Sequence, residues 1–280
     1  FLKDLELGRE VHLLVEKKGL GKKVSVRNAL VDMYVKCGKM DEARSVFDKI
    51  IEKDVVTWTT MIHGYSLNGD VRSALGLCQL MQFEGVKPNA VTLASLLASC
   101  ANLPNLKLGK CLHGWALRQR IESDVNVETA LIDLYAKCKC MRLSFKVFFK
   151  TSKTRTVPWN AILSGCIYNM LGEEAIELFR EMLLEGVKPN DATFKSLLPA
   201  FAVQADMQQA MSLHSYLIRS GFILRTEIAT GLVDIYCKCG NLKSGHRVFS
   251  GVPLKKRDIV LWSALIAGYG THGHGEIALS

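Results

Sequence analysis

The sequence lacks the features that mark several large classes of protein. No window approaches the roughly 18 uninterrupted apolar residues of a membrane-spanning helix, so we expect no membrane partner. Hydrophobic residues make up 49% of the chain and charged residues 22%, which excludes a disordered or collagen-like protein. There is also no Walker loop, no dinucleotide-binding fingerprint and no nucleophile elbow. We therefore predict that the chain is not itself an enzyme.

Motifs that hold metals or form disulfides are missing too. The nine cysteines are an odd number in a chain large enough to bury a core without disulfides, which favours a reducing compartment. One residue separates Cys138 from Cys140, and Cys237 from Cys239, whereas a zinc knuckle needs two, so we interpret these cysteines as packed thiols. His272-Gly-His274-Gly-Glu276 contains the His-x-Glu string of zinc deaminases, but no Pro-Cys-x-x-Cys segment follows it. We predict a loop there, and neither a metal, a cofactor nor a catalytic residue in the chain.

Positive charge is in excess. Lys and Arg number 36 against 27 Asp and Glu, giving a net charge of +9, which favours a polyanionic partner. The basic residues form no tight run. Lys107, Lys110, Arg118 and Arg120 are candidates for phosphate contacts, although a solvated helix face explains each of them equally well.

The chain repeats itself with a step of 101 residues. The step relates Tyr34 to Tyr135 and Tyr236, and Lys87-Pro88-Asn89 recurs at 188–190. Within each unit, apolar residues at helical spacing alternate with Gly and Pro stop signals, which predicts pairs of short helices. Because such helices are marginal alone, neighbouring pairs must stack. We predict an all-α fold, a right-handed superhelical α-solenoid of about nine helix-turn-helix repeats of 31–35 residues, the first and last incomplete.

The repeats divide the chain as one array. Their ranges are 1–23, 24–54, 55–89, 90–124, 125–155, 156–190, 191–225, 226–258 and 259–280.

The residues of several repeats carry a family resemblance. Residues 156–190 read TVPWNAILSGCIYNMLGEEAIELFREMLLEGVKPN, and this segment resembles the pentatricopeptide repeat along its whole length. NALVDMYVKCGKMDEARSVFD resembles the short type of that repeat, and SLLASCANLPNLKLGKCLHGWALR resembles the long type. The order is long for 1–23, then short, standard and long in turn, ending with a standard repeat at 259–280. This order resembles that of the PLS subclass of land-plant organellar proteins.

The resemblance implies sequence-specific binding of single-stranded RNA, about one base per repeat. It further implies a mitochondrial or chloroplast protein, although residues 1–10 mix acidic and basic side chains and are no transit peptide. The implied role is the targeting arm of a C-to-U RNA-editing factor, with other editing-complex proteins as partners and any deaminase domain outside this chain. Two alternatives stay open: transcript stabilisation or maturation, and a protein-interaction scaffold like a tetratricopeptide array.

In the family, the fifth and last residues of a repeat face one base. A carboxylate only accepts hydrogen bonds and suits the ring N–H of guanine or uracil, whereas an Asn amide can donate to adenine or cytosine. The implied base-reading residues are Asn28, Asp54, Thr59, Asn89, Thr129, Asn160, Asn190, Thr230, Asp258 and Ser263. Asn28 with Asp54 implies uracil, Thr59 with Asn89 adenine, Thr129 with Arg155 a weak purine preference, Asn160 with Asn190 a pyrimidine, and Thr230 with Asp258 guanine. The pairs of the long repeats, Ala94 with Asp124 and Lys195 with Arg225, carry no assigned base and are written n. Taken together, the pairs imply a target of roughly 5′-U-A-n-r-Y-n-G-3′.

The second residue of a repeat is implied to wedge between neighbouring bases. Val56, Val91, Val157 and Val260 fit this base-stacking role, whereas Ser25, Asn126, Ala192 and Glu227 are poorer wedges. Helix capping is the alternative explanation for the polar base-reading residues, because Asn, Asp and Thr are what helix N-termini use.

Overall fold

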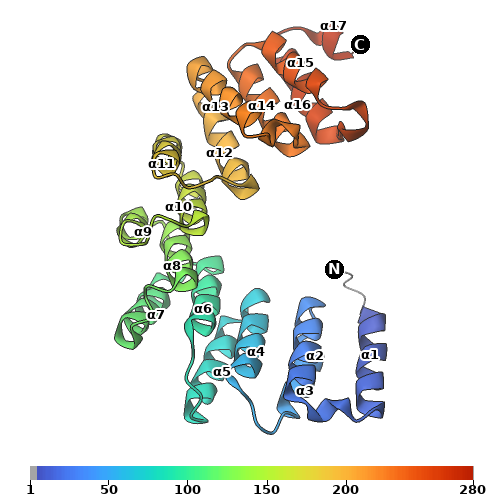
Figure 1. The fold of residues 1–280 in the computed structure, drawn as a ribbon, viewed down its shortest axis with the longest axis vertical. Coiled ribbons are helices and arrows are strands. Elements are labelled where there is room, and N and C mark those ends of the chain that lie inside the picture. The colour runs from blue at the N-terminus through green and yellow to red at the C-terminus, as the bar shows by residue number, and fades with distance from the viewer. Residues whose placement is uncertain (1–4, 280) are drawn as a thin grey trace. The chain divides into compact units, whose positions relative to one another are not determined.

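The computed structural model describes residues 5–279, and every regular element within that range is a helix (Figure 1). The all-α prediction is thereby confirmed. The chain forms two compact units, Phe1–Phe149 and Lys150–Ser280. Among the described residues, no helix is long and apolar enough to cross a membrane.

The first unit contains nine α-helices within residues 5–149. They are α1 (Leu5–Lys17), α2 (Val24–Lys36), α3 (Met40–Asp48), α4 (Val55–Leu67), α5 (Val71–Phe83), α6 (Ala90–Asn102), α7 (Leu106–Gln119), α8 (Val125–Lys137) and α9 (Met141–Phe148). A short 3₁₀ turn, Leu20–Lys22, joins α1 to α2.

In both units the even-numbered helices from α2 on are the first helices of the hairpins, and the odd-numbered helices are the second helices. Within residues 150–279 the second unit contains α10 (Thr156–Tyr168), α11 (Gly172–Leu184), α12 (Asp191–Gln204), α13 (Met207–Arg219), α14 (Thr226–Lys238), α15 (Leu242–Gly251), α16 (Ile259–Thr271) and α17 (Gly275–Leu279). The His-x-Glu stretch is only partly the loop that we predicted, because the turn covers His272 to His274 and Glu276 already lies in α17.

The first helix of each hairpin packs against the first helix of the next hairpin. In the first unit α2 contacts α4, α4 contacts α6, and α6 contacts α8; in the second unit α10, α12, α14 and α16 follow in the same way. Several second helices pack both against the first helix of their own hairpin and against the first helix that follows: α3, α5 and α7 do so in the first unit, and α11 and α15 in the second. The first helices therefore make a continuous layer within each unit.

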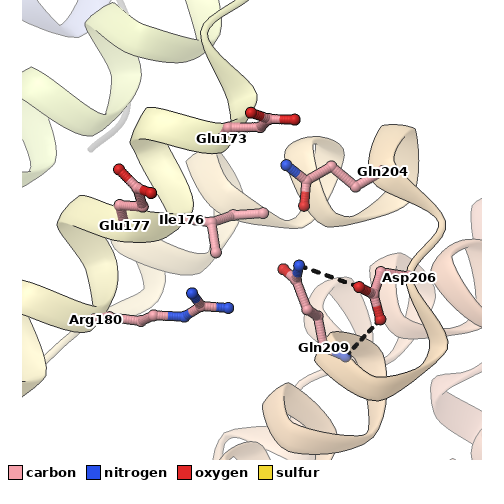
Figure 2. A pocket seen from close by; sticks show the side chains of 7 residues that line it. All are labelled: Glu173, Ile176, Glu177, Arg180, Gln204, Asp206 and Gln209. Carbon is pink, nitrogen blue, oxygen red and sulfur yellow. Dashed lines mark hydrogen bonds between the residues drawn. The ribbon is translucent and has the colours of Figure 1, made fainter.

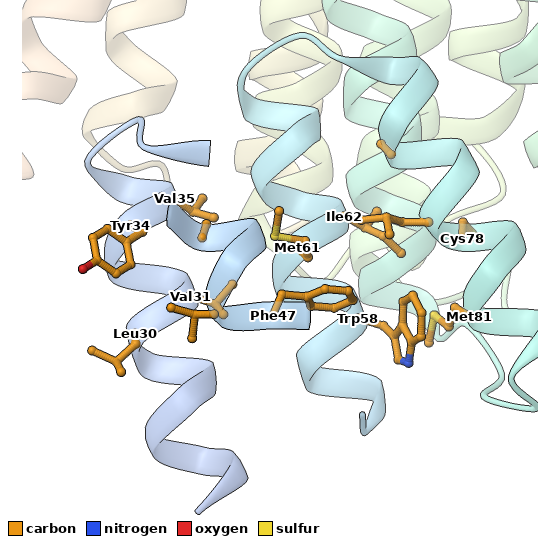
Figure 3. Close-up of a cluster of buried hydrophobic side chains, with 14 of the residues drawn as sticks. Leu30, Val31, Tyr34, Val35, Phe47, Trp58, Met61, Ile62, Cys78 and Met81 are labelled. Carbon is orange, nitrogen blue, oxygen red and sulfur yellow. The ribbon is translucent and has the colours of Figure 1, made fainter. Parts of the chain in front are cut away.

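Large apolar side chains fill the space between the hairpins. In the first unit Phe47, Trp58 and Met61 are buried together, and the rings of Phe47 and Trp58 meet edge to face with centroids 5.1 Å apart (Figure 3). Neighbouring repeats also approach closely at a glycine: a Cβ atom on Gly109 would lie 2.4 Å from Cδ2 of Leu134. Packing of this kind stabilises helices that are too short to persist alone.

A histidine–tyrosine hydrogen bond links α1 to α2, α7 to α8 and α13 to α14. His12 Nδ1 lies 2.9 Å from the hydroxyl of Tyr34, and the same bond is 2.8 Å long for His113 with Tyr135 and for His214 with Tyr236. Each tyrosine is buried, so the bond satisfies a hydroxyl that would be costly to leave without a partner. The histidines recur with the step of 101 residues, and this signal is one that the sequence analysis missed.

Candidate nucleic-acid interface

The last residue of most repeats is the N-cap of the next repeat's first helix. Asp54 Oδ1 accepts a hydrogen bond from the backbone N–H of Thr57 (2.7 Å), and Asn89 Oδ1 accepts one from Thr92 (2.9 Å). Equivalent caps are made by Asn190 to Thr193 (3.1 Å), by Asp258 to Leu261 (2.9 Å) and by Asp124 to Asn126 (2.9 Å). Arg155, which precedes α10, makes no such cap.

Capping fixes which polar atom remains for a ligand. Once Oδ1 accepts from the helix, an Asn keeps its Nδ2 amide, a donor, and an Asp keeps Oδ2, an acceptor. Asn89, Asn190, Asp54 and Asp258 are all exposed. The capping explanation and the base-reading explanation are therefore compatible, since the cap itself orients the donor or acceptor away from the helix.

The fifth residue of a repeat lies beside that cap in three repeats. Asn160 Nδ2 donates to Asn190 Oδ1 (3.0 Å), and Asn28 Nδ2 lies 3.4 Å from Asp54 Oδ1. Thr59 is buried, and its hydroxyl lies 2.7 Å from the hydroxyl of Thr92. The backbone N–H of Thr92 in turn donates to Asn89 Oδ1 in the cap of α6. The structure thus brings together Asn28 with Asp54, Thr59 with Asn89 through Thr92, and Asn160 with Asn190.

Three other fifth residues turn back to their own helix. The hydroxyl of Thr129 donates to the carbonyl of Val125 (2.6 Å), that of Thr230 to Thr226 (2.8 Å) and that of Ser263 to Ile259 (2.7 Å). All three lie in the first turn of their first helix, at the same place as Asn28 and Asn160. Their position in the fold is shared, whereas their hydrogen bonds differ.

The four valines predicted to stack on bases lie in the layer of first helices, one residue after the helix start. Their side chains are exposed: Val56 54%, Val91 51%, Val157 55% and Val260 60%. Exposed valines directly beside polar caps provide an apolar surface for a flat ligand. Glu227, one of the residues predicted to be poorer wedges, forms an ion pair with Lys195 (3.1 Å), so its charge is partly offset.

Hydrogen bonds from neighbouring residues stabilise the ionised carboxylate of Asp54. Burial alone would raise the pKa of its carboxyl, but hydrogen bonds from the backbone and hydroxyl of Thr57 and from the amide of Asn28 outweigh it and lower that pKa. At neutral pH the carboxylate is therefore ionised and acts only as an acceptor. This is the state that the predicted preference for uracil requires.

Family comparison agrees with the repeated architecture. The PPR repeat family matches residues 53–102 and 154–203, and the PPR repeat matches residues 25–55. The chain belongs to the PPR repeat family. The predicted resemblance to pentatricopeptide repeats is thereby confirmed, whereas its PLS subclass stays a prediction.

Curated relatives extend along nearly the whole chain. Pentatricopeptide repeat-containing protein At5g39350 of Arabidopsis thaliana is 56% identical over 280 residues, covering 99% of this chain and 41% of the relative. A mitochondrial relative from the same plant, At2g03380, is 39% identical over 97% of the chain and 39% of its own length. A chloroplastic relative, At1g11290, is 34% identical over 99% of the chain and 34% of its own length. The PPR chain thus spans well under half of these relatives.

Solved structures share the fold. The maize pentatricopeptide repeat protein PPR10 superimposes with a TM-score of 0.75 at 20% identity, covering 98% of this chain and 40% of PPR10. PPR10 in complex with an 18-nt psaJ RNA element gives a TM-score of 0.72, covering 98% of this chain and 42% of PPR10. At this identity the likeness extends to the fold alone.

Other predicted candidates lie outside the layer of first helices. Lys107, Lys110 and Arg118 belong to α7, a second helix, and Arg120 is its C-cap. An open pocket of about 400 Å³ in the second unit lies between α11, the end of α12 and the start of α13, and is lined by Glu173, Ile176, Glu177, Arg180, Gln204, Asp206 and Gln209 (Figure 2). It includes no base-reading residue of the PPR repeats.

The nine cysteines are free thiols, and three of those in the Cys-x-Cys pairs are half-buried. Burial raises the pKa of the Cys138 thiol, and Cys140 adds to this effect, so Cys138 stays protonated at neutral pH and is a poor ligand. Burial likewise raises the pKa of Cys237 to about 11. Among the residues that the structure describes, no cluster of three or more His, Cys, Asp or Glu could hold a metal ion.

One set of residues at this interface was not predicted from the sequence. The threonines at the third position of three repeats, Thr57, Thr92 and Thr193, each contact both members of a predicted base-reading pair. A Thr three residues after an Asn or Asp is a capping pattern, which could have pointed to the cap. It could not have revealed the bond to the preceding repeat.

Proposed function

We propose that this chain binds single-stranded RNA sequence-specifically, at about one base per repeat. The observation that carries the proposal is the cap: Asp54, Asn89, Asn190 and Asp258 each use one side-chain oxygen on a helix and keep a second polar atom exposed. An Asp then offers an acceptor and an Asn offers a donor, which is the distinction that separates keto from amino bases. The net charge of +9 supports a polyanion, and PPR10, which shares the fold, binds an 18-nt RNA element.

Stacking supplies the sequence-independent part of the proposed binding. Base stacking on side chains contributes to the binding of single strands whatever their sequence, and the four exposed valines stand next to the caps. With the N-terminus over the RNA 5′ end, the proposed target is roughly 5′-U-A-n-r-Y-n-G-3′. The two long repeats contribute no assigned base.

The alternation of helix lengths supports the PLS subclass. The second helices of the proposed short repeats are α3, α9 and α15, with 9, 8 and 10 residues, whereas α5 and α11 have 13 residues and α7 has 14. We propose that the chain is the targeting arm of an organellar C-to-U editing factor. The cytidine chemistry would then come from a deaminase domain or partner outside these residues. The mitochondrial and chloroplastic relatives support an organellar protein.

A titration tests the proposal. The chain is titrated into labelled U-A-n-r-Y-n-G RNA and into a scrambled RNA of the same composition at a fixed, near-physiological salt concentration, because phosphate contacts alone depend steeply on salt. Tighter binding of the target is expected. Equal binding of both RNAs would favour the protein-interaction scaffold, and a comparison of edited sites in a loss-of-function plant separates an editing role from transcript stabilisation.

Substitution of a single cap sharpens the test. Asn89→Asp keeps the cap of α6 but exchanges the outward donor for an acceptor, so preference at one position should move from adenine toward guanine. Asn105→Asp is the matched control, because Asn105 caps α7, a second helix, by accepting from Leu108 N (3.1 Å). A uniform loss of binding in Asn89→Asp would mean that Asn89 only holds the helix.

A further inference from the structure

Three buried threonine hydroxyls cross the boundary between repeats. Thr57 donates to Asn28 Oδ1 at 2.8 Å, Thr92 pairs with the hydroxyl of Thr59 at 2.7 Å, and Thr193 donates to Asn160 Oδ1 at 2.6 Å. Each of these threonines is the third residue of its repeat, and each bonds the fifth residue of the repeat before. All three are 0% exposed, so RNA cannot touch them and any influence on a base must pass through the fifth residue.

The hydrogen bonds around Thr193 determine how the Asn160 amide is turned. The Thr193 oxygen accepts from the backbone N–H of Asn190 (3.0 Å), and its single hydrogen can go to Asn160 Oδ1 (2.6 Å) or to Asn190 Oδ1 (3.2 Å). Asn190 Oδ1 already accepts from Thr193 N and from Asn160 Nδ2. The hydrogen therefore belongs on Asn160 Oδ1, and the amide cannot flip without losing both this bond and the bond to Asn190.

The consequence is a set of donors facing outward. With the oxygens of Asn160 and Asn190 engaged inside the network, the polar hydrogens left for a base are amide N–H groups. A pyrimidine accepts such hydrogens at its O2 atom, and cytosine also at its ring nitrogen. These donors match acceptors of the pyrimidine proposed for this pair, whereas an acceptor-only side chain in their place would not.

A natural counter-example lies in the same unit. Thr230 and Asp258 belong to one repeat, and the third residue of the following repeat is Leu261, which is buried and has no hydroxyl. Thr230 instead donates its hydrogen to the carbonyl of Thr226 in its own helix and offers only lone pairs to a ligand. The same fifth residue, Thr, pairs across the boundary at Thr59, where the third residue is Thr92.

We propose that the third residue of the following repeat is a positioning residue for base reading: a Thr there orients the fifth residue of the preceding repeat and so decides which polar atoms meet the base. The reading unit is then three residues that span a repeat boundary. This inference rests on the proposed RNA binding and names no further contact with RNA.

The experiment replaces the hydroxyl and keeps the shape. Thr193→Val and Thr193→Ser are made in the full chain, and dissociation constants are measured for four RNAs that differ only at the base assigned to Asn160 and Asn190. In Thr193→Val the preference for pyrimidine over purine should fall by about threefold to tenfold, the value of one net hydrogen bond. Thr193→Ser, which retains the hydroxyl, should restore the preference.

A second cap serves as the control for stability. Asn241→Ala removes the cap of α15, where Asn241 accepts from Ser244 N (3.0 Å), so it should lower the melting temperature and leave the base preference unchanged. An equal loss for all four RNAs in Thr193→Val, or an unchanged preference, would overturn the inference while leaving the RNA proposal intact. A wild-type chain without any base preference would overturn the RNA proposal, and this inference with it.

Discussion

Two proposed base-reading positions in the second unit have the same place in their repeats and differ in their side-chain hydrogen bonds. At the first, Asn160 is tied to Asn190 and Thr193 across the repeat boundary. At the second, Thr230 is tied to its own helix, and Asp258 caps α16 alone. Because both pairs occupy the first turn of a first helix, the fold supplies the position. The side chains supply the donors and acceptors, and the difference teaches that position and chemistry are encoded separately.

The largest expected effect concerns the tryptophans at the fourth position of two predicted repeats, 156–190 and 259–280. Trp159, just before Asn160, is 0% exposed, and its indole N–H donates to the carbonyl of Lys153 (3.0 Å). Trp262, the fourth residue of its own repeat, is 42% exposed. Trp159→Ala should lower the free energy of unfolding by about 3–5 kcal/mol, and Trp262→Ala should cost distinctly less. Chemical denaturation followed by circular dichroism measures both, and equal losses would contradict the difference in burial.

Next in size is an exchange of base preference at the second position. Asp258→Asn keeps an Asx cap on α16 but turns the exposed acceptor into a donor. Binding to the RNA with guanine should weaken and binding to the RNA with adenine should strengthen, by about 1–3 kcal/mol in relative terms for an unmatched polar group. The measurement is a pair of titrations with RNAs that differ at this base alone. Asn241→Asp, at the cap of a second helix, should leave both affinities unchanged.

A smaller effect is expected at the joint between α13 and α14, which lies between the two positions in the chain. Burial lowers the pKa of His214, the partner of Tyr236, below its ordinary value of 6.5. The unfolded chain therefore binds a proton more readily than the folded chain, so stability is fully present above pH 6.5 and declines as the pH falls through the folded pKa. His214→Gln should flatten this part of the curve of unfolding free energy against pH. An unchanged curve would show that His214 does not titrate differently on folding.

Repetition made the layout of both positions predictable from sequence. Apolar residues at helical spacing with Gly and Pro stop signals predicted the hairpins. Asn, Asp and Thr at the helix starts left capping open as an alternative to base reading, because both signals are local. The valines at the second position were predicted on the same surface, and their exposure agrees with it.

The networks were not predictable in the same way. The bond from Thr193 to Asn160 joins residues 33 apart and depends on how far one first helix is shifted along the next. The sequence of a single repeat does not determine the shift between neighbouring first helices. The histidine–tyrosine bonds join residues 22 apart. They were easier to predict from the sequence, because both partners recur with the repeat.

The smallest effect concerns the turn that follows each first helix. In the repeat of Asn160 this turn places Met170 at φ 62°, whereas the repeat of Ser263 has Gly273 at φ 78°. A left-handed backbone costs a residue with a Cβ atom about 1–2 kcal/mol, and glycine avoids that cost but loses more entropy on folding. Because Met170 is 86% exposed, Met170→Gly loses little packing. It should raise the free energy of unfolding by up to about 1 kcal/mol, which thermal melting can detect. A lower melting temperature would mean that the exposed Met170 side chain stabilises the turn by more than its backbone strain costs.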